Sequence, residues 1–89
     1  MTASNRDKLA EAGYEDSVVF ESPDYDDAII GVTDDGNVVY DFYKMVEHLM
    51  NKDGITFLEA VDFIEYNTIR ALPYAGGTAP IIVTMLKDL

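Results

Sequence analysis

The residues that most often do chemistry in enzymes are sparse in this chain. It has no cysteine and a single histidine, His48, so thiolate nucleophiles, disulfides and thiolate metal sites are excluded. His48 lies between Lys44 and Lys52, one helical turn away on each side. Nothing in the pattern completes the set of nucleophile, base and orienting group that covalent catalysis needs. We therefore expect His48 to be a solvated surface residue and the protein not to be an enzyme.

Carboxylates are plentiful, and one trio has the regular spacing of a helix face. Glu59, Asp62 and Glu65 recur at every third position. Two carboxylates share acid–base work only when their surroundings separate their pKa values, and a helix flank exposed to water does not do so. We therefore expect this trio to form a solvated face.

Two other short patterns suggest bound ions but fail on spacing. A calcium loop of the EF-hand type needs oxygen ligands at positions 1, 3 and 5, glycine at 6 and glutamate at 12. Counted from Asp24, positions 5 and 6 are Ala28 and Ile29. The pair Gly76 and Gly77 has neither the spacing of a phosphate loop nor a lysine close in sequence. The sequence thus predicts turns at these places, with no metal and no cofactor.

The strongest compositional feature is an uneven negative charge. The net charge is −11, and the segment from Leu9 to Tyr43 contains ten carboxylates and no lysine or arginine. Nucleic acid and anionic lipid are poor partners for such a chain, because phosphates attract Lys and Arg. A basic protein surface is attracted instead. The simpler interpretation is that the acidity serves solubility.

One cation stands apart near the end of a predicted helix. Arg70 is the only basic residue between Lys52 and Lys87, and the helix dipole favours a cation there. One interpretation is structural, a clamp onto a carboxylate or onto a carbonyl of the loop at 73–80. The other is a recognition patch, because Tyr and Arg dominate binding hot spots. That patch consists of Tyr66, Asn67, Arg70 and Tyr74.

The elements that must position these residues belong to a single domain, residues 1–89. Residues 1–16 form a short helix or a frayed terminus, and β-branched residues predict a strand at 17–21. A β-hairpin is predicted over 28–42, because Gly36 can adopt the positive φ of a tight reversal.

Two helices and a last strand follow the hairpin. Apolar spacing predicts a helix at about 41–53, and the capping-box spacing of Thr56 and Glu59 begins a second one, which runs to 72. The second helix is apolar on more than one side, which predicts burial on more than one side or a subunit contact. The apolar run at about 80–86 predicts a central strand. The expected fold is α+β, a small and mainly antiparallel sheet covered on one face by an antiparallel helix pair.

Two segments together resemble a known group of proteins. "DYDDAIIGVTDDGNVVYDF" and "FIEYNTIRALPYAGGTAPIIV" are similar to an uncharacterised family of small proteins from phages and prophages of Gram-positive, often gut, bacteria. The resemblance covers roughly residues 20–83 and brings no catalytic motif with it. It implies a phage-borne accessory protein. Short acidic phage proteins include anti-CRISPR and anti-restriction inhibitors that imitate DNA, which is an analogy of class.

These observations lead to two functional hypotheses. In the first, the protein is a non-enzymatic inhibitor whose acidic face binds a basic nucleic-acid-handling host protein, such as a nuclease or CRISPR effector, without binding nucleic acid or membrane itself. In the alternative, the second helix builds a homodimer or larger assembly of unknown role. No apolar stretch reaches the ~18–20 residues of a membrane span, so we expect a cytoplasmic protein of the bacterial host. The acidic face of the first hypothesis consists of Glu21, Asp24, Asp26, Asp27, Asp34 and Asp35.

Overall fold

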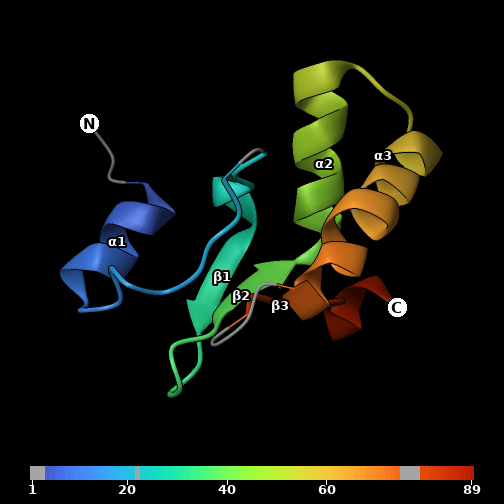
Figure 1. Ribbon diagram of the computed structural model, residues 1–89. Helices are drawn as coiled ribbons and strands as arrows, with labels where there is room; N and C mark the ends of the chain where they lie inside the picture. The colour runs from blue at the N-terminus through green and yellow to red at the C-terminus, as the bar shows by residue number, and fades with distance from the viewer. Residues whose placement is uncertain (1–3, 22, 75–78) are drawn as a thin grey trace.

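The computed structural model describes residues 4–21, 23–74 and 79–89, with the backbone alone for residues 71, 73 and 74. A three-stranded sheet lies in the middle, with α1 on one side and α2 and α3 on the other (Figure 1). The predicted α+β class is therefore confirmed. The elements follow in the order α1 (Asn5–Glu11), a 3₁₀ turn (Asp26–Ala28), β1 (Ile29–Val32), β2 (Val38–Asp41), α2 (Phe42–Asp53), α3 (Phe57–Phe63), a π turn (Ile64–Thr68), a 3₁₀ segment (Ile69–Tyr74), β3 (Ile81–Val83) and a 3₁₀ turn (Leu86–Asp88).

The predicted hairpin is present and is formed by β1 and β2, which pair antiparallel. Gly36 takes a φ of +88° at the reversal, and its N–H donates to the carbonyl of Thr33 at 2.9 Å. The Thr33 hydroxyl also accepts from the N–H of Asn37 at 3.0 Å. The register shifts between Ile29 and Gly31, so β1 contains a bulge that bends the strand locally.

The last strand differs from its prediction in position and direction. β3 pairs with β2 only, and it does so in parallel, so the sheet is mixed and β2 is the central strand. The strand is also shorter than the predicted 80–86, and the Ile81 side chain is 37% exposed. An apolar run indicates that side chains are covered, but it does not indicate how many neighbouring strands pair with the backbone.

The prediction of a strand at 17–21 is wrong. These residues form no ladder with the sheet and run as irregular chain over the core. The N–H of Phe20 donates to the hydroxyl of Tyr40 at 3.0 Å, so a side chain provides the partner that a strand would have provided. Phe20 also packs its ring against Tyr40, with centroids 4.7 Å apart. The β-branched and aromatic content therefore reflects packing and not pairing.

Three helices begin at a Ser, Asp or Thr side chain that accepts backbone N–H groups of the first turn. Ser4 caps α1 and forms a capping box with Asp7. The carboxylate of Asp41 accepts the backbone N–H groups of Tyr43 and Lys44 at the start of α2. Asp41 is only 3% exposed, so this carboxylate serves the fold. α2 and α3 pack side by side and antiparallel, as predicted (Figure 1).

The second predicted helix is helical throughout, but it is not one α-helix. Thr56 and Glu59 form the expected capping box, and regular α geometry ends at Phe63. The N–H of Ile69 bonds to the carbonyl of Ile64, five residues back, which is the pattern of a π turn. The remaining residues up to 74 are 3₁₀. The extra residue in this turn changes which side chains face outward in the second half of the run.

Candidate protein-interaction surfaces

Two of the six predicted acidic-face residues are used inside the fold. The Asp26 carboxylate accepts the backbone N–H groups of Asn5 and Arg6, each at 3.0 Å. These are the first two donors of α1, which have no partner within the helix. Asp24 accepts the N–H of Asp26 at 3.2 Å, and both aspartates are half-buried. Asp26 therefore joins α1 to the turn before β1, and Asp24 orders that turn.

The other four acidic-face residues are exposed: Glu21, Asp27, Asp34 and Asp35. Asp27 lies in the 3₁₀ turn that precedes β1, whereas Asp34 and Asp35 lie at the hairpin tip that follows it (Figure 1). The four residues of β1 separate these places by ~13 Å, which exceeds a Debye length of ~8 Å at physiological ionic strength. The two groups therefore act on a partner as separate charges and not as one row.

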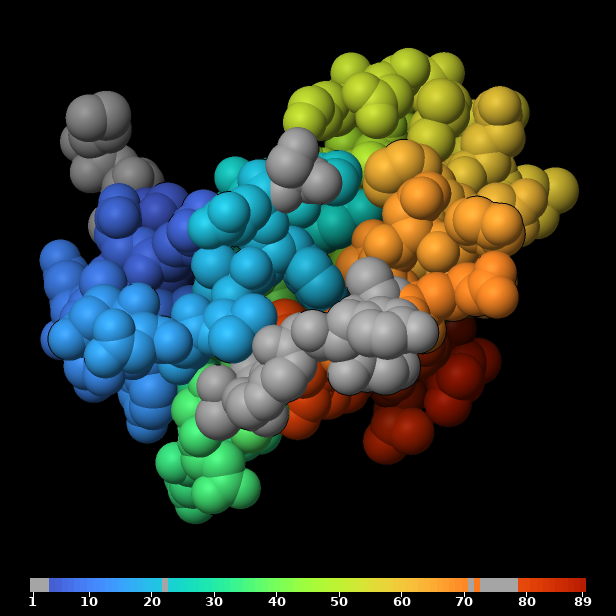
Figure 2. Space-filling model, in the orientation of Figure 1, coloured from blue at the N-terminus to red at the C-terminus, as the bar shows by residue number. Residues whose placement is uncertain are grey.

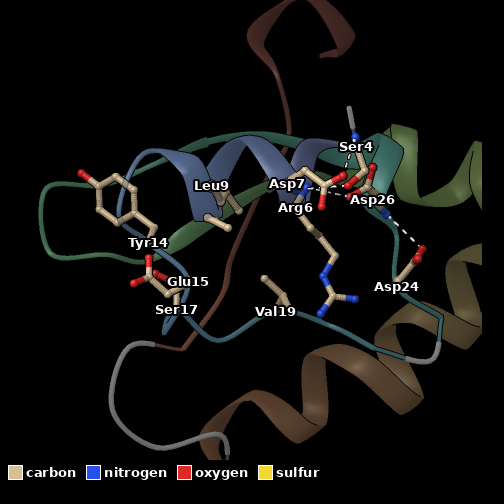
Figure 3. Close-up of a pocket in the computed structure, with 11 residues that line it drawn as sticks. Ser4, Arg6, Asp7, Leu9, Tyr14, Glu15, Ser17, Val19, Asp24 and Asp26 are labelled. Atoms are coloured by element: carbon tan, nitrogen blue, oxygen red, sulfur yellow. Dashed lines mark hydrogen bonds between the residues drawn. The ribbon is translucent and has the colours of Figure 1, made fainter. Parts of the chain in front are cut away.

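A hollow of about 560 Å³ lies between α1 and the segments at 14–19 and 24–26. Figure 3 shows the Arg6 side chain pointing from α1 into this hollow, toward the chain between Val19 and Asp24. Asp7, Glu15, Asp24 and Asp26 also line it. Four carboxylates around one guanidinium leave the hollow negative, so it does not suit a phosphate.

The single histidine is not the solvated surface residue that we expected. His48 is half-buried, and its Nε2 is buried without a hydrogen-bond partner. Its ring lies against the ring of Tyr25, with centroids 5.4 Å apart. Tyr25 is 1% exposed and adopts a left-handed φ of 49°. The Asp-rich turn that contains this tyrosine gave no signal of a core residue in the sequence.

The Tyr25 hydroxyl is a second buried polar group without a hydrogen-bond partner. Burial raises the pKa of this phenol, and the Thr68 side chain, which lies nearby but outside hydrogen-bond geometry, acts in the opposite direction. No group of three or more His, Asp or Glu side chains suited to a metal ion occurs among the described residues. Tyr25 and His48 thus face each other in the core without completing a metal site there.

A shallow groove of about 710 Å³ runs along the helical segment from Glu59 to Arg70. The Arg70 guanidinium lies over the ring of Tyr66, 4.9 Å from its centroid, and Tyr66 is 70% exposed. The Asn67 side chain donates to the carbonyl of Phe63 at 3.3 Å. Three members of the predicted recognition patch are therefore brought together, and the fourth, the Tyr74 side chain, lies outside the described residues. The clamp onto the 73–80 loop lies mostly outside them and stays a prediction.

The groove also contains the carboxylate trio that the sequence singled out. Glu59, Asp62 and Glu65 are exposed, as predicted. The backbone N–H of Thr56 bonds to the Glu59 carboxylate and lowers its pKa, so this group favours its charged form. The groove therefore combines aromatic surface with negative charge. We name these seven residues the α3 groove: Glu59, Asp62, Phe63, Glu65, Tyr66, Asn67 and Arg70.

The second predicted helix is not buried on more than one side within this chain. Its inner side chains include Ala60 and Ile64, both 0% exposed. The outer side exposes Phe57, Leu58 and Ile69 as well as the groove aromatics, and Leu58 is 72% exposed. Figure 2 shows this run, in gold and orange, at the molecular surface and apart from the green hairpin at the bottom. The all-round apolar pattern therefore leaves an exposed apolar face on the outer side of this run.

The described surfaces define a small α+β protein that presents an acidic hairpin and a mixed aromatic and acidic groove. No helix in the described part of the chain is long and apolar enough to cross a membrane. A scan against protein-family models, a search of curated proteins and a search of solved structures found no match for this chain. The resemblance to phage and prophage proteins stays a prediction.

Proposed function

We propose that this chain is a non-enzymatic protein that binds a basic partner protein. One observation supports this function above the others. Seven of the ten carboxylates between Leu9 and Tyr43 are exposed, and no cation lies in that segment. Such a surface excludes phosphate polymers and attracts basic proteins.

The narrower form of the proposal is inhibition of a nucleic-acid-handling protein. The channel of such a protein is lined with Lys and Arg that bind phosphates. Exposed carboxylates such as Asp34 and Asp35, projecting at a hairpin tip, can compete for those cations. A complex of this kind forms fast at low salt, and its affinity falls as salt is added.

Affinity capture from a lysate of the source cell tests this function. We expect the chain to retain a basic, nucleic-acid-handling protein, and the double variant Asp34→Asn, Asp35→Asn to retain much less of it. The matched control is Glu47→Gln, Asp88→Asn, which removes the same charge at two exposed positions elsewhere. Capture of no basic protein would overturn the proposal, and capture of a basic protein that does not handle nucleic acid would overturn its narrower form. Equal retention by both double variants would mean that the hairpin does not contribute to binding.

A homo-oligomer is the second candidate, and the exposed apolar side chains of α3 favour it. Phe57 and Leu58 lie outside the core on the first turn of this helix. Burial of such side chains between two copies stabilises a dimer by ~25 cal/mol for each Å² of apolar surface removed from water. Sedimentation velocity over a range of concentrations decides this point: a mass that stays at 9.9 kDa rejects the candidate.

A further inference from the structure

The α3 groove combines exposed aromatic surface with an excess of negative charge. It presents the rings of Phe63 and Tyr66, of which the first is 38% and the second 70% exposed. It also contains three carboxylates but only one guanidinium, that of Arg70, so its net charge is negative. An occupant must therefore offer positive charge and apolar surface within the same short segment.

Arg70 prepares the groove for such an occupant. Its guanidinium lies over the Tyr66 ring and restricts the motion of a side chain that is otherwise surrounded by solvent. Tyrosine has only two side-chain torsions, so a held tyrosine loses little conformational entropy on binding. Tyr and Arg are also the residues most enriched in binding hot spots. The pair is therefore a preformed contact point.

The π turn explains how the backbone presents this pair. Ile64 and Thr68 point inward and are buried, whereas Glu65, Tyr66 and Asn67 between them are exposed. A π turn costs stability relative to continuous α-helix and is frequent at functional sites. Its extra residue widens the outer surface where the aromatic and charged side chains lie.

The chemistry of the groove selects one kind of occupant. Lys and Arg lay their aliphatic stems along apolar surface and keep the charged head free, and both are attracted to the face of an aromatic ring. Asp62 and Glu65 then lie within the same groove as partners for the charged heads. A purely apolar segment would leave these carboxylates without a counter-charge, and an acidic one would be repelled.

We propose that the α3 groove binds an amphipathic basic segment of the partner protein, with Lys or Arg spaced beside an aliphatic or aromatic side chain. This inference rests on the proposed function, because it names the part of the basic partner that is recognised and the surface that recognises it. The hairpin carboxylates then contribute long-range attraction, and the groove contributes the short-range contact.

Fluorescence anisotropy with three labelled synthetic peptides tests the inference. The first peptide repeats Lys, Leu and Trp with helical spacing. The second has the same charge but Ser and Gly in place of Leu and Trp, and the third has Glu in place of Lys. We expect the first to bind at least tenfold more tightly than the second, and the third not to bind. Equal binding of the first two would overturn the groove proposal and leave only general charge attraction.

Variants then locate the binding site. We expect Tyr66→Ala to weaken binding of the first peptide about tenfold, while Leu58→Ala leaves it unchanged. Leu58 is the matched control because it is equally exposed on the same helical run but does not line the groove. Equal loss in both variants would overturn the assignment. Circular dichroism spectra and melting curves of both variants verify that each is folded.

A charge-matched pair separates this inference from the proposed function. We expect Asp62→Asn, Glu65→Gln to weaken binding of the first peptide several-fold more than Asp34→Asn, Asp35→Asn, although both remove the same charge. The reverse order would overturn the groove and keep the acidic binding function. Absence of binding by either basic peptide, together with capture of no basic protein, would overturn both.

Discussion

Two buried tyrosines carry their hydroxyl groups into different surroundings. The Tyr40 hydroxyl accepts the N–H of Phe20 at 3.0 Å, and it thereby fixes the irregular segment that precedes the hairpin. The Tyr25 hydroxyl is buried without a hydrogen-bond partner. Burial raises the pKa of both phenols, so both groups are neutral at physiological pH. The same chemical group is therefore favourable at one position and unfavourable at the other.

This contrast predicts opposite effects for the same substitution. Tyr40→Phe leaves the Phe20 N–H without its partner and is expected to lower the free energy of unfolding by ~1–3 kcal/mol. Tyr25→Phe removes an unpaired buried hydroxyl and is expected to raise it by ~1 kcal/mol. Urea unfolding followed by circular dichroism measures both. A loss of stability in Tyr25→Phe as large as that in Tyr40→Phe would show that the Tyr25 hydroxyl has a partner in solution.

At the scale of elements, local signals account for what the sequence predicts well. The hairpin turn at Gly36 and the capping box of Thr56 and Glu59 both depend on residues a few positions apart. The strand predicted at 17–21 failed because pairing depends on distant backbone. The π turn was not predicted either, because it follows from one hydrogen bond between Ile69 and Ile64 that no residue pattern specifies.

The cap of α3 makes the stability of the fold depend on pH in a defined direction. The pKa of Glu59 is lowered mainly by the hydrogen bond that the Thr56 backbone N–H donates to its carboxylate. The Thr56 side chain lowers this pKa further. A lowered pKa in the folded state means that its contribution to stability is present above the unfolded value of 4.5 and is lost as pH falls through the folded value. Glu59→Gln removes the charge and keeps an oxygen acceptor for the cap.

We therefore expect wild type to be more stable than Glu59→Gln at pH 7, with a difference that shrinks as pH falls from 4.5 through the lowered pKa of the folded state. Urea unfolding of both proteins at pH 7, 5, 4 and 3 measures this difference. The other carboxylates titrate in both proteins, so their effects cancel in the comparison. Equal stability of the two proteins at every pH would mean that the hydrogen bond, which Gln can also accept, and not the charge stabilises the cap.

At the scale of the whole molecule, the sequence predicted the amount of charge but not its arrangement. Composition gave the excess of carboxylates, and chain position could not show that Asp26 accepts the first N–H groups of α1. It also could not show that Asp27 lies before β1 and is separated by that strand from Asp34 and Asp35. Residues 66, 67 and 70 were singled out together because they share one helical run, and local spacing was sufficient to place them side by side.

The uneven charge also affects the stability of the molecule before any partner binds. The radius of gyration is 13.0 Å, and the Debye length is ~30 Å at 0.01 M salt but ~8 Å at 0.15 M. At low salt every carboxylate therefore repels those on the far side of the molecule, whereas at 0.15 M it acts only on its neighbours. With a net charge of −11, repulsion must dominate over attraction when screening is weak.

We expect the melting temperature to rise by several degrees when KCl is increased from 0.01 M to 0.15 M, since ~1 kcal/mol corresponds to ~4–8 °C for a domain of this size. Calorimetry or a circular dichroism melt measures the shift. Asp34→Asn, Asp35→Asn removes two of the eleven net negative charges, and it should melt higher than wild type at 0.01 M and show a smaller rise with salt. A melting temperature that falls with added KCl would mean that ion pairs outweigh repulsion, and the exposed acidity would then be balanced within the fold and not open to a basic partner.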